Sequence, residues 1–301
     1  MTRNDLPLEI PIYRPGPYGP VLTVVAPSGR LAAPGLVVVG GAGTGGSTKA
    51  DGVFVRVARA GTMLGYDSVR FDWHGVGGSL GEVERFSMVA PFVEDVEAAI
   101  GALDGDRRPL VMVGFCYGSR AVLEAALSTE TVAGVLLVSY PMPKQLSNKQ
   151  WAARKLPVGK AIRLALRPSA IRGWFDGRSR RLYLKWVRLR ATRGRPADSS
   201  KPHRQSENLV ALAGKIRQLI SRGVRIRFVY GVGDKQQELF RAAVAGPLSD
   251  IFSDPAGLVD MVETPGDLYG WTTVESQERA VEAVVDFARQ FAPTLPLEEA
   301  I

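Results

Sequence analysis

A glycine-flanked cysteine, in the run Gly114-Phe115-Cys116-Tyr117-Gly118, places the tightest constraint on how this 301-residue chain can fold. The apolar run 110–113 precedes it and predicts a short buried strand, and the segment 119–128 carries apolar residues at helical spacing. Strand, sharp turn and helix form the context in which a G-x-S-x-G pattern presents a nucleophile. A residue held at positive φ on such a turn leaves no room for side chains two positions away on either side, which explains both glycines. The pattern therefore predicts that Cys116 occupies a nucleophile position.

Apolar runs and helical periodicities alternate along most of the remaining chain. The prolines before residue 35 favour edge strands, and continuous apolar runs are typical of strands buried on both faces. We expect strands at 21–25, 36–39, 68–71, 110–113, 132–140, 224–230 and 258–262. We expect helices near 54–63 with Met63 on the inward face, at 89–103, 119–128, 206–221 and 236–245, and from a capping box Thr272-x-x-Glu275 onward. This order predicts an α/β fold with a mostly parallel central sheet and helices on both faces.

Basic residues are concentrated in one segment that interrupts the alternation. Residues 144–204 contain 18 Lys and Arg against two acidic residues, a net charge of +16, whereas the rest of the chain carries 20 basic and 28 acidic residues. Apolar residues interleave with the arginines, so we expect the segment to be helical. We interpret residues 142–205 as a basic helical cap inserted into a core formed by 1–141 and 206–301.

The cysteine and histidine counts exclude several classes of site. A single cysteine excludes an internal disulfide and zinc-finger spacing, and the two histidines, His74 and His203, stand 129 positions apart, which argues against a metal site. No cofactor is expected. The first residues lack the apolar core of a signal peptide, and no apolar run approaches the ~18 residues of a membrane span. We therefore expect a cytoplasmic protein.

The motifs together resemble the α/β-hydrolase family over nearly the whole chain. The matching pieces are Val39-Gly40-Gly41-Ala42, Arg70-Phe71-Asp72-x-x-Gly75-x-Gly77-x-Ser79, Gly114-x-Cys116-x-Gly118 and a strand-end Asp234. The likeness is nearest to hydrolases found with exosortase systems and, more loosely, to dienelactone hydrolases, which also use cysteine. The resemblance implies the α/β-hydrolase fold, with the basic segment as a cap over the active site.

The resemblance also implies roles for individual residues. Cys116 would be the nucleophile, and the backbone N–H of Tyr117 with one from the Gly41-Ala42 region would form the oxyanion hole. Asp234 occupies the place of the triad acid. A simpler role stays open for two of them, since Cys116 could be a small buried apolar residue and Asp234 a helix cap.

The triad histidine is missing from its expected loop. The family carries it after the last strand, where this chain reads Pro265-Gly266-Asp267-Leu268, so a leucine stands in its place. His74 is a candidate substitute base, although a loop hydrogen-bonding role suits it better, and His203 is a weaker candidate in a hydrophilic stretch. The triad is therefore incomplete.

A cysteine retains useful chemistry without that base. Its thiolate forms more readily than an alkoxide, and we expect the helix N-terminus to lower its pKa further. A thiolate can displace the thiolate of a thioester, whereas hydrolysis of the acyl-enzyme requires an activated water. The sequence therefore predicts an enzyme that takes an acyl group from a thioester through Cys116 and passes it on.

The charge pattern predicts the partners. A basic cap would attract acyl thioesters on acidic acyl carrier proteins or on phosphate-bearing coenzyme A. Tryptophans among the charges leave peripheral membrane contact open, and nucleic-acid binding is disfavoured because no known module is present. Two alternatives to acyl transfer remain: a catalytically silent relative that binds an acyl ligand or partner protein, and a non-covalent cyclase that uses the same pocket.

Overall fold

The computed structural model describes residues 6–42, 52–83, 86–88, 90–104, 108–142, 204–253, 256–266, 268 and 273–292. Most of these residues belong to one compact unit made of residues 1–142 and 211–301. The basic segment 142–205 lies almost entirely outside the described residues, so its role as a helical cap stays a prediction. In the part that is described, no helix has the length and apolar character needed to cross a membrane.

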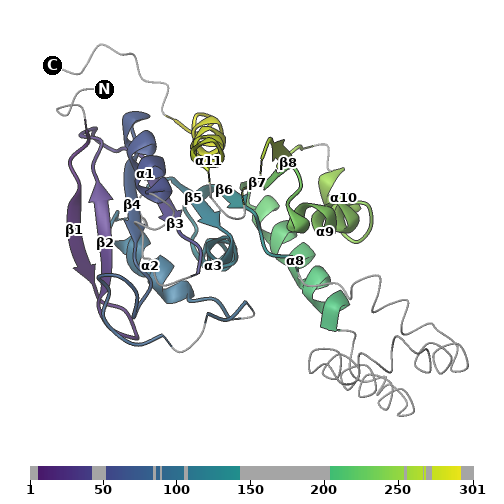
Figure 1. Ribbon diagram of the computed structural model, residues 1–301, viewed down its shortest axis with the longest axis horizontal. Helices are drawn as coiled ribbons and strands as arrows, with labels where there is room; N and C mark the ends of the chain where they lie inside the picture. Colours follow the sequence, from purple (N-terminus) through teal and green to yellow (C-terminus); the bar gives the residue numbers. More distant parts are fainter. Residues whose placement is uncertain are drawn as a thin grey trace, which may run out of the picture. The chain divides into compact units, whose positions relative to one another are not determined.

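Eight strands form one sheet in the order β1-β2-β4-β3-β5-β6-β7-β8 (Figure 1). Strands β1 and β2 pair antiparallel with each other and β2 with β4, and all other neighbours pair parallel. The strands are β1 (Ile10–Arg14), β2 (Val21–Ala26), β3 (Gly35–Val39), β4 (Asp67–Phe71), β5 (Leu110–Phe115), β6 (Val132–Val138), β7 (Arg225–Gly231) and β8 (Val259–Thr264). The mostly parallel sheet expected from the apolar runs is confirmed.

Helices connect the parallel strands and cover the sheet. They are α1 (Val53–Met63), α2 (Val93–Gly101), α3 (Tyr117–Ser128), α8 (Arg204–Ile220), α9 (Lys235–Val244), α10 (Ser249–Phe252) and α11 (Val274–Ala288). Helix α1 packs against α11, and α2 packs against α3. Every residue of β3 and β5 is buried, as continuous apolar strands between two helical layers require.

Three local expectations are corrected by the structure. Helix α2 begins at Val93 instead of residue 89, because Pro91 has no N–H and disfavours helical backbone at the preceding residue. The capping box of α11 lies one residue later than expected, since Thr273 and Ser276 exchange side-chain and backbone hydrogen bonds. Met63 is 62% exposed because it ends α1 beyond the face that Phe54, Val57 and Ala58 bury.

Candidate functional site

The turn between β5 and α3 has the geometry of a nucleophile elbow. Cys116 has φ 50° and ψ −113° and forms the N-cap of α3. Its backbone N–H donates to the Val138 carbonyl at 2.9 Å, and its carbonyl accepts from the Ser119 N–H at 3.0 Å. A side chain at positive φ is strained, so the neighbouring strand and helix must hold it there.

The two glycines of the motif are required by close packing. A Cβ atom at Gly114 would lie 2.5 Å from Cα of Ser119, and one at Gly118 would lie 2.4 Å from the Val39 carbonyl oxygen. Either distance is too short for non-bonded atoms, so only glycine fits these positions. The steric reading of the motif is therefore confirmed, and Cys116 stands at the carboxyl edge of the sheet.

Ser119 holds the elbow from inside, a role that the motif did not reveal. It is fully buried, and its hydroxyl Oγ lies 2.7 Å from the Gly114 carbonyl oxygen and 3.0 Å from that of Val138. These contacts join the strand before the cysteine to the adjacent strand β6.

The end of β3 lies beside the elbow. A Cβ atom built on Gly41 would be 3.7 Å from Cβ of Cys116, so this backbone passes the nucleophile position closely. The indole N–H of Trp73 donates to the Gly41 carbonyl at 3.3 Å, which orients the Gly41–Ala42 peptide. Tyr117, the other expected oxyanion-hole residue, follows Cys116 directly and has a fully buried side chain.

The Tyr117 ring fixes the start of α3 against the start of α2. Its hydroxyl oxygen accepts the Phe92 N–H at 3.0 Å, and its ring meets that of Trp73 edge-on at 5.2 Å. Burial raises the pKa of Tyr117 to about 12, so the hydroxyl stays neutral. The backbone N–H of the same residue is thereby held at a defined place behind the cysteine.

The thiol of Cys116 is less acidic than the helix N-terminus led us to expect. Burial raises its pKa most, the Tyr117 N–H lowers it, the charge of Asp234 raises it and that of Arg120 lowers it. Desolvation of the thiolate outweighs the helix-terminal N–H. The expectation of a lowered pKa is therefore wrong.

Asp234 stands at the carboxyl end of β7, close enough to act on the thiol electrostatically. It is 3% exposed and forms the N-cap of α9, where its Oδ1 accepts the Gln236 N–H at 2.8 Å. The helix-cap role is thus present in the structure, and the same carboxylate is one of the charges that the Cys116 thiol senses.

Arg120 is a second charge near the thiol that the sequence did not single out. Its guanidinium donates to the Pro141 carbonyl from Nε and Nη2, at 3.2 and 2.6 Å, and to the Met88 carbonyl at 2.9 Å. Arg120 therefore ties the chain before α2 to the chain after β6, on either side of the start of α3.

The structure places His74 against a buried carboxylate. Its Nδ1 lies 2.8 Å from Oδ2 of Asp95, its backbone N–H donates to the same oxygen at 2.9 Å, and its ring stacks on Tyr18. Burial raises the pKa of Asp95, and the hydrogen bonds from His74 lower it. Among the residues described, nothing joins the His74 ring to Cys116, so its use as a base stays an untested prediction.

Leu268 lies where the resemblance places the triad histidine, and it is a core residue. It is fully buried in the apolar cluster formed by the inner faces of α1, α11 and the sheet. The position is thus filled by a packed leucine. His203 and most of the loop around Leu268 lie outside the described residues.

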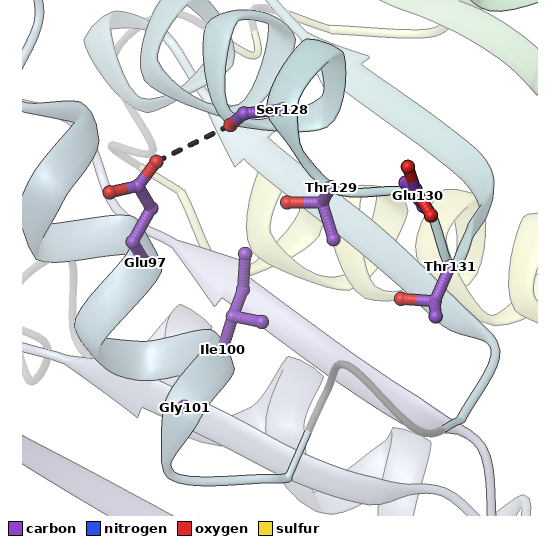
Figure 2. Close-up of a pocket in the computed structure, with 7 residues that line it drawn as sticks. All are labelled: Glu97, Ile100, Gly101, Ser128, Thr129, Glu130 and Thr131. Atoms are coloured by element: carbon purple, nitrogen blue, oxygen red, sulfur yellow. Dashed lines mark hydrogen bonds between the residues drawn. The ribbon is translucent and has the colours of Figure 1, made fainter.

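A cavity of about 530 Å³ opens near the amino ends of the parallel strands, whereas Cys116 stands at their carboxyl ends (Figure 2). Its walls come from the ends of α2 and α3 and from the chain entering β6, with Ser128 Oγ 3.3 Å from a Glu97 oxygen. None of the expected site residues lines it, since its lining is Glu97, Ile100, Gly101, Ser128, Thr129, Glu130 and Thr131. Within the described ranges, no group of three His, Cys, Asp or Glu could hold a metal ion.

Comparison with known proteins agrees with this geometry. Solved structures that share the fold include an α/β serine hydrolase without a lid from Xanthomonas campestris, 19% identical, with a TM-score of 0.51 and coverage of 96% of this chain and 97% of that one. An esterase from Pyrococcus furiosus is 13% identical, with a TM-score of 0.56 and coverage of 97% and 95%. A proline iminopeptidase from Mycobacterium smegmatis is 15% identical, with a TM-score of 0.52 and coverage of 93% and 98%.

No curated protein sequence matches this chain. A model of the alpha/beta hydrolase family matches residues 36–258, which is well over half of the chain and includes the elbow, the Gly41 loop and Asp234. The chain therefore belongs to the alpha/beta hydrolase family.

Proposed function

We propose that this protein is an acyl-transfer enzyme that takes an acyl group from a thioester onto Cys116. One observation carries the proposal: the elbow holds a cysteine at φ 50° between two sterically required glycines, while a core leucine stands in the place of the histidine. Strain of this kind persists only where the surrounding structure maintains it, and it clusters at active sites. We propose as part of the same hypothesis that the protein is related to exosortase-associated hydrolases and, more loosely, to dienelactone hydrolases.

Thioester exchange suits a site without a general base because the attacking and the departing sulfur have similar stability as thiolates, so bond exchange itself needs no proton transfer. The Cys116 sulfur attacks the acyl carbonyl carbon, a new C–S bond forms, and the old C–S bond breaks. The thiol proton leaves with the departing thiol, so no external base is consumed. Hydrolysis of an ester differs, because water must lose a proton and the alkoxide must gain one. The raised pKa of Cys116 slows the first step without changing this balance.

The oxyanion that forms during the attack needs two donors. We assign them to the backbone N–H of Tyr117 and to an N–H of the Gly41-Ala42 segment. The hydrogen bond from the Trp73 indole to the Gly41 carbonyl holds that segment in place. Asp234 would act through its charge on the thiol and His74 through the loop that it holds.

The donor that we propose is an acyl group on an acidic acyl carrier protein or on coenzyme A, in the cytoplasm. The support is the net charge of +16 on residues 144–204, which would steer either donor toward a cap formed by residues 142–205. The alternative role for residues 142–205 is peripheral contact with a membrane surface.

The test is intact-mass spectrometry after incubation with octanoyl coenzyme A. We expect a mass increase equal to one octanoyl group that persists for minutes, because nothing described in the site activates water. Cys116→Ala should abolish the increase. If the mass stays unchanged with donors of several chain lengths while iodoacetamide still alkylates Cys116, covalent transfer is refuted.

A catalytically silent acyl-binding relative is the second candidate. The raised pKa of Cys116 and the packing of Leu268 in the core favour it over an ester hydrolase. It predicts saturable binding of octanoyl coenzyme A, measured by calorimetry, that Cys116→Ala leaves unchanged. A non-covalent cyclase would also survive that substitution but would release a changed product.

A further inference from the structure

Ser139, the residue directly after β6, combines a strained backbone with a buried hydroxyl. It has φ 49°, and its N–H donates to the Val229 carbonyl at 2.8 Å. Its side chain is fully buried, and the hydroxyl has no hydrogen-bond partner within the described part of the chain. Positive φ is unfavourable for serine, and a buried hydroxyl without a partner is a second cost.

Glycine at this position would remove both costs, whereas alanine would remove the unpartnered hydroxyl and keep the positive φ. Glycine adopts positive φ freely, and alanine has no polar atom to satisfy. A residue that costs stability in two ways at the edge of a site points to a role outside the fold itself.

Ser139 stands beside the nucleophile. Strands β5 and β6 run parallel with Phe115 opposite Val138, so the next residues in register are Cys116 and Ser139. The Cys116 N–H donates to the Val138 carbonyl at 2.9 Å, which ties the elbow to the residue before Ser139. The two side chains therefore start from neighbouring positions at the carboxyl edge of the sheet.

The sheet order places Ser139 on a particular flank of Cys116. Strand β5 lies between β3 and β6, so Gly41 follows the strand on one side of the nucleophile and Ser139 follows the strand on the other. The oxyanion hole proposed above places the acyl oxygen on the β3 side of Cys116. The leaving group and the incoming acceptor would then lie on the other side, near the ends of β6 and β7. Asp234 stands at the end of β7 on that same flank.

We propose, building on the acyl transfer proposed above, that the Ser139 hydroxyl binds the acceptor, a neutral amine or thiol. The hydroxyl accepts a hydrogen bond from the acceptor N–H or S–H and orients its lone pair toward the acyl carbon. With an amine, a C–N bond forms, the C–S bond to Cys116 breaks, and the amine proton ends on the Cys116 thiol. The raised pKa of that thiol makes it a good recipient of the proton.

The experiment separates loading from transfer. Wild type, Ser139→Ala and Ser139→Gly are loaded with octanoyl coenzyme A, freed of donor and mixed with glycinamide, and the loss of the octanoyl mass from the protein is followed. We expect both variants to load at the wild-type rate, to transfer about tenfold more slowly because one hydrogen bond is lost, and to unfold at a higher temperature than wild type.

Ser68→Ala is the matched control. Ser68 on β4 is also fully buried with an unpartnered hydroxyl among the described residues, but it lies near the amino end of its strand, away from the elbow. We expect this control to transfer at the wild-type rate. Wild-type transfer rates in both Ser139 variants, or a lower unfolding temperature in Ser139→Ala, would overturn the proposal. Failure of wild type to load would instead refute the acyl transfer itself.

Discussion

At the scale of single residues, the reactivity of Cys116 depends on neighbours that act on its thiol in opposite directions. Burial and the charge of Asp234 raise the pKa, while the Tyr117 N–H and the charge of Arg120 lower it. The thiolate is the attacking species, so a raised pKa means a smaller reactive fraction at neutral pH. The rate of alkylation should therefore keep rising, about tenfold per pH unit, beyond the ordinary thiol pKa of about 8.5.

Asp234→Asn tests the charge directly. Asparagine is as good a helix cap as aspartate, so α9 should keep its N-terminus. Removing the negative charge lowers the pKa of Cys116, and iodoacetamide should alkylate the variant several-fold faster at pH 7.5, with a rate that levels off at lower pH than in wild type. Slower alkylation of a folded variant would show that Asp234 assists the thiol by another route.

Leu268→His should destabilise the protein instead of restoring a triad. Leu268 is fully buried in the cluster shared by α1, α11 and the sheet, where an imidazole would lose packing and leave polar atoms without partners. We expect a loss of roughly 2–4 kcal/mol in urea unfolding. Leu268→Met conserves volume and should cost less than about 1.5 kcal/mol. A stable histidine variant with new activity on p-nitrophenyl acetate would contradict this placement.

At the scale of elements, the elbow is held by contacts between backbones. A Cβ atom at Gly118 would lie 2.4 Å from the Val39 carbonyl oxygen and 2.5 Å from that of Gly40, so the start of α3 and the end of β3 touch. This contact keeps the Gly41 segment beside Cys116.

Gly118→Ala should therefore separate β3 from the elbow. We expect acylation of Cys116 by octanoyl coenzyme A to fall by at least tenfold, and stability to drop by about 1–3 kcal/mol, because backbone atoms cannot move aside without displacing both elements. Gly214→Ala is the control, since nothing lies within 4 Å of a Cβ atom there in mid-helix α8. It should gain about 0.5–1 kcal/mol and keep wild-type acylation.

The elements that the sequence predicts well are those set by local pattern. Apolar runs locate the parallel strands, and the G-x-C-x-G spacing locates the elbow because its steric rule is local. Ser139 and Leu268 are two positions whose structural role could not be predicted from local sequence patterns. The strain at Ser139 arises from its register beside β5 and β7, and the burial of Leu268 depends on packing against α1, which is far away in sequence, as well as against α11. No local pattern carries either fact.

At the scale of the whole molecule, charge is divided between two parts of the chain. Residues 144–204 carry +16, whereas the rest carries more acidic than basic residues. A field of this kind raises the rate at which acidic partners arrive, and salt weakens it because the Debye length falls from about 10 Å at 0.1 M to about 3 Å at 1 M. The expected signature is therefore kinetic and depends on the charge of the donor.

We expect an octanoyl group on an acidic carrier protein to load Cys116 at least tenfold faster than octanoyl-N-acetylcysteamine at 50 mM salt, and the advantage to shrink at 500 mM. Replacing Arg178, Arg180 and Arg181 by glutamine should reduce it several-fold.

The matched control replaces three arginines on the surface of the α/β unit, the exposed Arg241 and Arg289 and the half-buried Arg279, which form surface ion pairs of little energetic worth. Both triple variants lose the same charge, so only a local field distinguishes them. If they lose the advantage equally, net charge alone steers the donor. If neither loses it, recognition of the carrier does not use the basic segment, and the acyl group must be delivered by contacts elsewhere on the core.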